Sequence, residues 1–513
     1  MRLSNKHANP QLIEYKDFSG GLNTSNASEM IRQNELAKAI NVQIDPSTGL
    51  LKTVSGMDTI YKDPDKTFDV LIYDVIGDTF LMITTDGTVY ALSRDVADGV
   101  IIAPSQTIVI EEKGQLTGNG RVASAVWEDG VIIASGGKLQ YYHGGTLETI
   151  TESPETCNGA FVKDGRVWTF WGDELHASGI GDEHQWENDP SRDDSSQWLQ
   201  IGYKDGGSIV GLCALSSDTL VFKDNHHAYR VSGSYPDWVV KEVGRSIDCK
   251  ALDCCLSVGN SVVTLGDARM QAVSVTNEYG DMKAAELSIK VAADIRALGE
   301  AKLRYVSPLN QVWIFNTVTD TFLFYDIGCQ GFFHRKYRGR ARDVVTIQDD
   351  IYILKEHGLY KNTDRHMTED GEAIRWAFQA KTMVSNNHYL IKRVSANITP
   401  YFENYAEEWF KVGDVVLWGG LPWTSRGIWH NFAQIYHSKL PLKGTRVRGL
   451  YQNSDEVYDD EDYIYGNETY IRSINCYASG TRCVNRRPSI PVRARGGGGI
   501  TLFNAITFEI AEV

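Results

Sequence analysis

Short apolar strands separated by polar turns repeat along residues 69–364 of this 513-residue chain. Each unit contains an apolar strand, a polar turn, a second apolar strand, another turn and a strand that often carries Tyr or Phe. Seven such units begin at residues 69, 123, 159, 208, 252, 304 and 341. Their mean spacing of about 45 residues is typical of one four-stranded β-propeller blade. One such sheet cannot bury both faces alone, whereas radial stacking buries them.

Two other repetitive β architectures are less compatible with this pattern. Stacked β-sandwiches have similar short strands but no steady period over so long a stretch, and a β-helix has a shorter period. Composition agrees with a β-rich fold, because aromatic residues make up 11% of the chain and there are 47 Gly but only 13 Pro. We therefore predict an all-β fold with a propeller of six to eight blades over residues 61–376.

The two flanking segments lack the blade spacing. Residues 1–60 are polar and short, and residues 377–513 contain strands that end in an alternating apolar pattern over 500–513. Because a propeller is a closed ring, its first and last strands lie close together. We therefore expect residues 1–60 to pack with the C-terminal β domain, residues 377–513, as one β-sandwich-like platform into which the propeller is inserted.

Three local elements are also expected. A short helix is predicted from Asn34 to Ile40, because Leu36, Ala39 and Ile40 share one helical face. Strands near 42–44 and 50–54 are expected to form a hairpin around the turn at 45–49. Apolar residues at 287, 291, 295 and 298 predict an amphipathic helix within 281–301, packed on the propeller.

The net charge and the absence of targeting segments restrict the classes of function that we expect. The formal net charge is −15, which argues against attraction of the whole surface to nucleic acid or anionic membrane. The first residues have no apolar core of a signal peptide, and no apolar run approaches the length of a membrane span. The eight cysteines are scattered, as is usual for reduced thiols. Cys476 and Cys483 are nevertheless compatible with a hairpin disulfide in oxidising surroundings.

No catalytic motif and no metal-binding or cofactor-binding motif is present. His226-His227 and Cys254-Cys255 are adjacent pairs, which point to opposite faces of a strand and make poor chelates. Most carboxylates stand in Asp-Gly turns. The acidic run at 454–464 is compatible with Ca²⁺ binding but lacks the pattern of an EF-hand, so a solvated loop is the better interpretation. We expect a protein that is not an enzyme and has no cofactor.

Two short stretches are locally basic, although the chain as a whole is acidic. They are compatible with phosphate contacts, with contacts to an acidic neighbouring subunit, or with solvated loops. The first basic stretch contains Arg335, Lys336, Arg338, Arg340 and Arg342, and the second contains Arg486, Arg487, Arg493 and Arg495. The glycines at 496–499 that follow the second stretch indicate a hinge or a close backbone approach.

An ordered series of N-terminal residues resembles the opening of tail proteins of tailed bacteriophages. The series has an FxGGLN segment, a short helix expected over Asn34-Glu-Leu-Ala37, an Asn-Val strand and a hairpin with two glycines. Its marker residues are Phe18, Gly20, Gly21, Leu22, Asn23, Asn41, Gly49 and Gly56. The order of N-terminal segment, propeller and terminal β domain is similar to the tail nozzle, or tail tubular protein B, class of short-tailed phages.

That resemblance implies a structural virion protein. It implies a homohexameric ring that forms a conduit and gate for double-stranded DNA, retains the genome until ejection, and contacts an adaptor ring and tail fibre or tip proteins. The implied location is the virion tail, after assembly in the host cytoplasm. A net acidic tube would let DNA pass without binding it.

Two other function classes stay open. One is a carbohydrate-binding or carbohydrate-active propeller of a phage tail, used for receptor recognition or depolymerisation. Aromatic residues that would stack on sugars are Trp168, Trp171, Trp186, Trp198 and Trp238, although strand tryptophans are more often core residues. The other class is a cellular propeller scaffold for protein partners.

Overall fold

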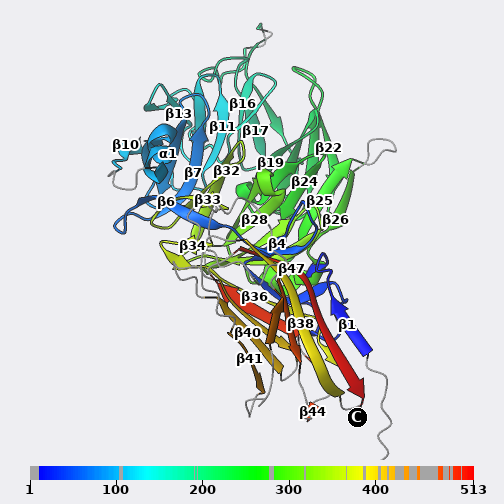
Figure 1. Cartoon of the computed structure of the whole chain (residues 1–513). Helices are drawn as coiled ribbons and strands as arrows, with labels where there is room; N and C mark the ends of the chain where they lie inside the picture. Colours follow the sequence, from blue (N-terminus) through cyan, green and yellow to red (C-terminus); the bar gives the residue numbers. More distant parts are fainter. Residues whose placement is uncertain are drawn as a thin grey trace, which may run out of the picture.

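The computed structural model shows seven four-stranded blades arranged in a ring, which confirms the all-β propeller fold (Figure 1). The structure describes residues 11–512 except 103–107, 190, 193, 276–281, 317–318, 365–366, 385–388, 402–405, 413–414, 422–431, 438–446, 451–471, 478–483, 486–488, 491 and 498–499. Only the backbone is described at 100–102, in the strands between 389 and 490, and at 496–497, 500–501, 504 and 508–512.

Every blade is an antiparallel meander whose first strand lies innermost. Blade 1 contains β7 (Phe68–Asp74), β8 (Thr79–Thr84), β9 (Thr88–Ser93) and β10 (Glu111–Gln115), with α1 (Arg94–Ile102) before its last strand. Blade 2 contains β11 (Ala123–Trp127), β12 (Gly130–Ala134), β13 (Gln140–His143) and β14 (Thr146–Thr149). Blade 3 contains β15 (Phe161–Lys163), β16 (Arg166–Trp171), β17 (Glu174–Ala177) and β18 (Gln197–Gln200). Blade 4 contains β19 (Ile209–Leu215), β20 (Asp218–Lys223), β21 (Ala228–Ser232) and β22 (Val239–Gly244).

The remaining blades complete the ring. Blade 5 contains β23 (Cys255–Val258), β24 (Ser261–Leu265), β25 (Met270–Val275) and β26 (Met282–Glu286). Blade 6 contains β27 (Ala301–Val306), β28 (Gln311–Asn316), β29 (Thr321–Asp326) and β30 (Gly331–Lys336). Blade 7 contains β31 (Ala341–Ile347), β32 (Asp350–Lys355), β33 (Gly358–Thr363) and β6 (Gly56–Lys62). Each of the seven repeat units found in the sequence therefore corresponds to one blade.

The ring is closed by a strand from the N-terminal side of the chain. β6 pairs antiparallel with β33, so the last blade combines residues 56–62 with residues 341–363. β6 also spans the predicted boundary between residues 60 and 61, and it belongs to the propeller. Blade 7 packs on blade 1 through the rings of Phe80 and Tyr352, whose centroids are 4.6 Å apart.

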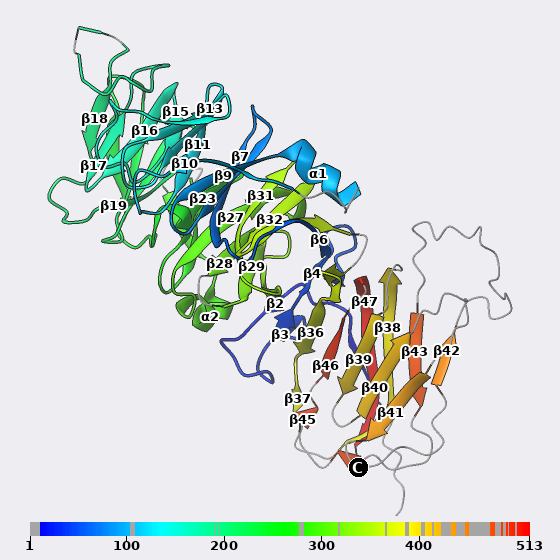
Figure 2. The same cartoon turned by 90° about the vertical axis from the view of Figure 1, so that its left-hand side faces the viewer.

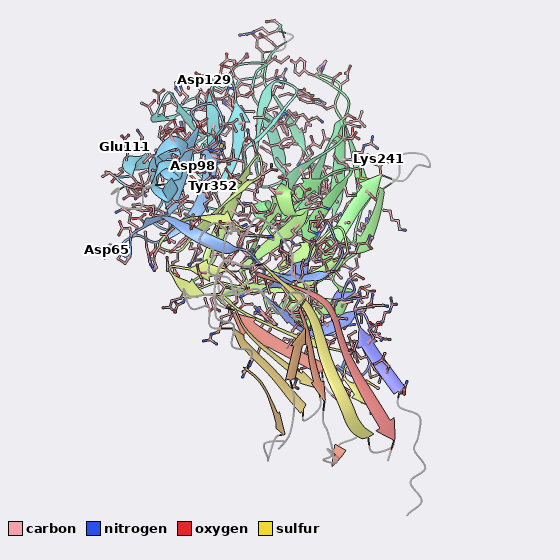
Figure 3. The ribbon with its side chains drawn as sticks, in the orientation of Figure 1. Asp65, Asp98, Glu111, Asp129, Lys241 and Tyr352 are labelled. Atoms are coloured by element: carbon pink, nitrogen blue, oxygen red, sulfur yellow. The ribbon has the colours of Figure 1, made fainter. Side chains whose placement is uncertain are left out.

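Ion pairs around α1 reinforce this closure. The Tyr352 hydroxyl donates a hydrogen bond of 2.7 Å to Asp98 of α1, and the two residues lie side by side in Figure 3. The Lys361 ammonium contacts both Asp98, at 3.0 Å, and Asp350, at 2.8 Å. Arg94 lies 3.6 Å from the same Asp350 carboxylate. Charges of both signs thus link blade 1 to blade 7.

Strands from both ends of the chain lie together at one end of the propeller (Figures 1 and 2). They are β1 (Gln11–Tyr15), β2 (Gly21–Leu22), β3 (Glu35–Ile40), β4 (Val42–Ile44), β5 (Leu51–Thr53), β36 (Arg375–Ala380), β38 (Tyr389–Tyr401), β39 (Ala406–Val412), β40 (Val415–Leu421), β41 (Phe432–His437), β42 (Val447–Leu450), β43 (Arg472–Tyr477), β46 (Val492–Gly497) and β47 (Ile500–Glu512). β1 and β5 pair with β47, and β3 pairs with β36. The division of these strands into a separate sandwich-like platform stays a prediction.

One sheet continues from the propeller into these terminal strands. β3 lies between β30, the outermost strand of blade 6, and β36, which in turn pairs with β46. The predicted hairpin is confirmed, because β4 pairs antiparallel with β5. Blade 6 is therefore the only described blade whose sheet is extended by strands from both chain ends.

Both predicted helices are wrong in extent or type. Residues 35–40 form strand β3, and a register shift between Leu36 and Lys38 breaks the alternation that would have marked a strand. Within 281–301, β26 occupies the first part, and helix is limited to η2 (Ile289–Val291) and α2 (Ala292–Arg296). Val291, Ile295 and Leu298 are buried, so the apolar spacing was correct only for the second half.

The closure can be tested by truncating one buried side chain of β6. Ile60 is 4% exposed, and we expect Ile60→Ala to lower the free energy of unfolding by about 2–5 kcal/mol, since a large side chain is lost from the packed interface. Leu12→Ala is the matched control, because Leu12 of β1 is 68% exposed and its loss should stay within about 0.5 kcal/mol. Chemical denaturation followed by tryptophan fluorescence measures both, and equal effects would contradict closure through β6.

Candidate functional site

The N-terminal series forms the junction between the propeller and the terminal strands. Gly21-Leu22 is strand β2, which pairs parallel with the start of β3. Phe18 is 1% exposed and packs its ring on Phe378 of β36, with centroids 5.5 Å apart. Gly21 has φ +65°, and a Cβ there would come within 2.7 Å of Gly331 Cα in blade 6. The backbone approach to blade 6 thus requires glycine at this position.

A buried carboxylate holds the first part of the junction. Glu35, 2% exposed, accepts hydrogen bonds from the Asn23 side chain, at 2.8 Å, and from the Arg32 backbone, at 2.9 Å. The Lys290 ammonium lies 3.1 Å from its other oxygen and also donates to the Gly20 carbonyl. Burial raises the pKa of Glu35, but these hydrogen bonds outweigh it and hold the pKa below its ordinary value.

The N-terminal segment also contacts the connector between blades 5 and 6. The backbone amides of Thr24 and Ser25 donate to the Lys290 carbonyl at 2.9 and 3.0 Å. The Thr24 hydroxyl donates to Asp294, which also contacts His334 at 3.4 Å. The η2 and α2 helices, which lie in the segment predicted as a helix packed on the propeller, therefore bind the N-terminal segment directly.

Asn41 joins three separate parts of the chain. Its side-chain amide donates to the carbonyls of Lys336, at 3.0 Å, and Arg375, at 2.7 Å, and accepts from the Lys336 amide at 2.7 Å. Its own backbone amide donates to His334, and its carbonyl accepts from Val54. With φ 55°, Asn41 adopts the left-handed conformation that asparagine tolerates better than most residues.

The last two residues of the series shape the approach to β6. Gly49 has φ +70°, and its amide donates to the Asp45 carbonyl at 2.8 Å, which closes the β4–β5 hairpin. Gly56 is the first residue of β6 and pairs with Thr363. Ser55, just before it, donates to Asp364 at the end of blade 7. All eight residues of the series therefore lie on the path from the terminal strands to ring closure.

Most of the first basic stretch is neutralised within the chain. Arg340 binds Glu356 through two nitrogens, at 3.2 and 3.0 Å, and Arg342 contacts the same carboxylate at 3.2 Å. Lys336 lies 3.2 Å from Asp320, and Arg338 pairs with Glu372. All four of these side chains therefore have carboxylate partners within the same chain.

Arg335 differs from the rest of this stretch. It is 0% exposed, and its guanidinium lies over the rings of Trp313, at 4.5 Å, and Tyr337, at 5.4 Å. Burial lowers the pKa of this arginine. The expectation that Arg335 contacts phosphate or a neighbouring subunit is therefore corrected, because alternation along β30 turns the side chain into the blade.

The second basic stretch is only partly described. Arg493 and Arg495 alternate with buried residues on β46 and are exposed, and Arg493 donates to the Gln379 side chain at 2.8 Å. Gly496 and Gly497 end the same strand. Arg486, Arg487, the acidic run at 454–464 and Cys483 lie outside the described residues, as do the side chain of Cys476 and the question of a disulfide.

Ion pairs cross the axis of the propeller. Lys302 at the start of blade 6 lies 2.7 Å from Asp69 of blade 1, although blade 7 stands between these blades. Arg121, which precedes blade 2, pairs with Asp253 at the start of blade 5 and donates to the Ala301 carbonyl at 3.0 Å. Arg304 and Asp343 form a further bidentate pair between blades 6 and 7. The axis of a single propeller is bridged by side chains at this level.

The two adjacent histidines, His226 and His227, lie close to carboxylates. His226 lies 2.9 Å from Asp248, whereas His227 lies 3.6 Å from Glu242. Across the residues described, no cluster of three or more His, Cys, Asp or Glu side chains is arranged to hold a metal ion. In the same part of the chain, no helix has the length and apolar character needed to span a bilayer.

The sequence pattern does not predict the contact between Glu35 and Lys290 that stabilises the junction. Glu35 lies in the stretch of the N-terminal series that the pattern predicts as a helix, and Lys290 lies far from it in sequence. No spacing rule relates the two, because their contact depends on how blade 5 connects to blade 6. The buried, multiply bonded Glu35 is visible only in three dimensions.

The fold defines the chain as a seven-bladed β-propeller protein, and comparisons with known proteins add little beyond that. No protein-family model and no curated protein matches the sequence. Similar solved structures include BamB from Moraxella catarrhalis (12% identity, 63% of this chain and 93% of that chain, TM-score 0.38). They also include the β-propeller domain of Swd1 from Myceliophteria thermophila (7% identity, 60% and 98%, TM-score 0.40) and the N-terminal domain of Nup159 (10% identity, 63% and 98%, TM-score 0.41).

Asn41 provides a direct test of the junction. We expect Asn41→Ala to lower the free energy of unfolding by about 2–4 kcal/mol, because buried backbone groups lose their partners and alanine resists a positive φ. Asn41→Gly removes only the hydrogen bonds and should recover about 1 kcal/mol. Asn310→Ala is the matched control: Asn310 is exposed with φ 51°, and its side chain accepts a solvent-exposed hydrogen bond of 3.1 Å from the Tyr305 hydroxyl, so the conformational part of the loss should dominate. Equal losses at both asparagines would contradict a special role for the Asn41 amide.

Glu35 makes the junction sensitive to acid. Its pKa is lowered in the folded state, so its contribution to stability is complete above its ordinary value of 4.5 and is lost as the pH falls through the lowered pKa. We expect Glu35→Gln to be less stable than the wild type at pH 7, with a difference that shrinks below about pH 4. Thermal melts from pH 7 to pH 3 measure this, and a difference that stays constant with pH would show that the charge is not responsible.

Proposed function

We propose that this chain is a structural subunit of the tail nozzle of a short-tailed bacteriophage. The observation that carries the proposal is the position of the family-like series from Phe18 to Gly56. In the structure, all of its members lie along one path that joins the terminal strands to the propeller. This position fits a protein in which the N-terminal series fixes the propeller on the terminal strands.

In this proposal, several copies form a ring, with six as the number that the family resemblance implies. The ring conducts double-stranded DNA, retains the genome until ejection, and contacts an adaptor ring and tail fibre or tip proteins. The chain acts in the virion tail after assembly in the host cytoplasm, and it is not an enzyme. Because ion pairs bridge the axis of each propeller, the DNA conduit has to lie between subunits rather than through one of them.

The charge distribution supports a conduit that does not grip DNA. The chain carries a net charge of −15, and four of the five cations in the first basic stretch pair with carboxylates of the same chain. The fifth, Arg335, is buried. A ring multiplies every inward-facing arginine by the number of subunits, so unpaired arginines would bind phosphate strongly and oppose passage of the duplex.

The proposal is tested by particle size, shape and DNA binding of the purified protein. We expect electron microscopy and native mass measurement to show rings of about six 57.3-kDa chains with an open centre. We expect only weak binding to double-stranded DNA between about 50 and 200 mM salt, the range in which phosphate-binding proteins lose affinity steeply.

Arginine variants separate a conduit from a DNA clamp. Neutralising Lys336, Arg338 and Arg340 together should leave the weak DNA binding unchanged, since each already has a carboxylate partner. Tight, salt-dependent binding that these substitutions abolish would replace the passive conduit by a clamp. A particle that stays monomeric at every concentration would overturn the nozzle proposal itself.

A further inference from the structure

Three aromatic rings form a stack across β16, β17 and β18 of blade 3, from the partly exposed Trp171 and His176 to the exposed Trp198. Trp171 of β16 stacks on His176 of β17, with ring centroids 3.6 Å apart and planes 19° from parallel. His176 is followed by Trp198 of β18, at 6.2 Å and 20°. His176 and Trp198 are direct cross-strand partners, so the sheet register holds the rings in line.

This stack is separate from the hydrophobic core of the blade. Trp168, on the opposite face of β16, is 2% exposed and packs with Trp238 against blade 4. Trp171 and Trp198 belong to none of the core clusters formed by the described residues, and Trp198 is 50% exposed. Of the tryptophans considered from the sequence, Trp198 and Trp171 are therefore the ones whose rings do not serve the core.

The outer end of the stack is open. β18 is an edge strand, which pairs with β17 and with no other strand among the residues that the structure describes. His176 covers one side of Trp198, so the other side of the indole faces outward. The stack therefore ends in an aromatic face at a sheet edge, on which another flat, partly apolar ring can pack.

Polar groups beside the stack restrict what can bind there. Gln200 shares the exposed face of β18 with Trp198 and donates to Asp173 at 3.1 Å. Glu174 lies opposite Gln200 and contacts the His176 ring nitrogen at 3.0 Å. Burial lowers the pKa of His176 despite this carboxylate, which leaves the imidazole neutral near pH 7. The site therefore combines neutral aromatic faces, an amide and two carboxylates.

These features favour a neutral sugar over other ring-shaped ligands. The apolar face of a pyranose ring packs on an indole, while its hydroxyl groups donate to carboxylates and bond to amides. A nucleotide or a sulfated glycan would also stack, but its negative charge would be repelled by Asp173 and Glu174. Charge thus selects among the ligands that stacking alone would admit.

We propose that the Trp171–His176–Trp198 stack is a binding platform for an uncharged saccharide chain. A terminal or internal pyranose ring lies on the outward face of Trp198, and Gln200, Asp173 and Glu174 bond to its hydroxyl groups. The inference does not depend on the proposed tail function, because it arises from blade 3 alone.

A panel of neutral oligosaccharides tests the platform. Glucose-, galactose-, mannose- and N-acetylglucosamine-based oligomers are titrated against the full chain, with tryptophan fluorescence and calorimetry as readouts and dextran sulfate as the anionic comparison. We expect at least one neutral series to bind, and dextran sulfate to bind more weakly. Trp198→Ala should weaken binding at least about 10-fold, whereas Trp198→Tyr keeps a stacking ring and should retain most of it.

Matched controls separate stacking from unfolding and self-association. Tyr203→Ala removes another exposed aromatic side chain, 68% exposed but outside the stack, and should leave binding unchanged. The melting temperature of Trp198→Ala should equal that of the wild type, because the ring lies outside the core. Failure of every neutral series to bind, or unchanged affinity in Trp198→Ala, would overturn the proposal.

A change of particle mass in Trp198→Ala would also overturn it, and would assign this face to a second copy of the chain. Ring formation by the wild type is measured independently of saccharide binding. Failure of the platform and failure of the nozzle proposal are therefore distinct results.

Discussion

The pairing of β6 with β33 is the interaction on which the rest of the structure depends. Each blade exposes two apolar faces that only its neighbours can cover, so an open ring would leave two faces in water. Closing the last blade with residues 56–62 covers both and ties the N-terminal side of the chain to residues 358–363. The chain consequently leaves the ring where it began, and the terminal strands from both ends meet there without any further constraint.

The junction converts this proximity into a fixed geometry. β3 pairs with both blade 6 and β36, so a single sheet runs from the propeller into the terminal strands. Apolar packing alone tolerates sliding, whereas Glu35 and Asn41 each satisfy several buried polar groups whose positions are specific. Any rotation of the propeller against the terminal strands would leave these groups without partners at a cost of about 1–3 kcal/mol each. The N-terminal series therefore fixes the orientation of the propeller relative to the terminal strands, in addition to holding the two together.

How much the sequence predicts depends on how local the cause is. The seven blades follow from a repeat in which each strand and turn is encoded within about 45 residues, and the β4–β5 hairpin follows from its turn residues. Strand β3 was mistaken for a helix because a bulge shifts its register and because its partners, β30 and β36, lie far away in sequence. The burial of Arg335 and the stack on blade 3 depend on which residues of neighbouring strands lie opposite each other, a register that the lengths of the connecting turns set and that the apolar repeat pattern alone does not show.

The same distinction between local and distant causes applies to charge. In the sequence, the first basic stretch is a patch of positive sign, but β-strand alternation buries Arg335 and folding supplies carboxylates from Asp320, Glu356 and Glu372. A cluster of cations in sequence is therefore not a cluster of available cations in space. The carboxylates that pair with these cations are drawn from the acidic excess of the chain, so folding mixes the two signs locally while the net charge of −15 is unchanged. Long-range repulsion of a polyanion then survives, because it depends on net charge, whereas capture of individual phosphates by the first basic stretch, which needs unpaired cations, is suppressed.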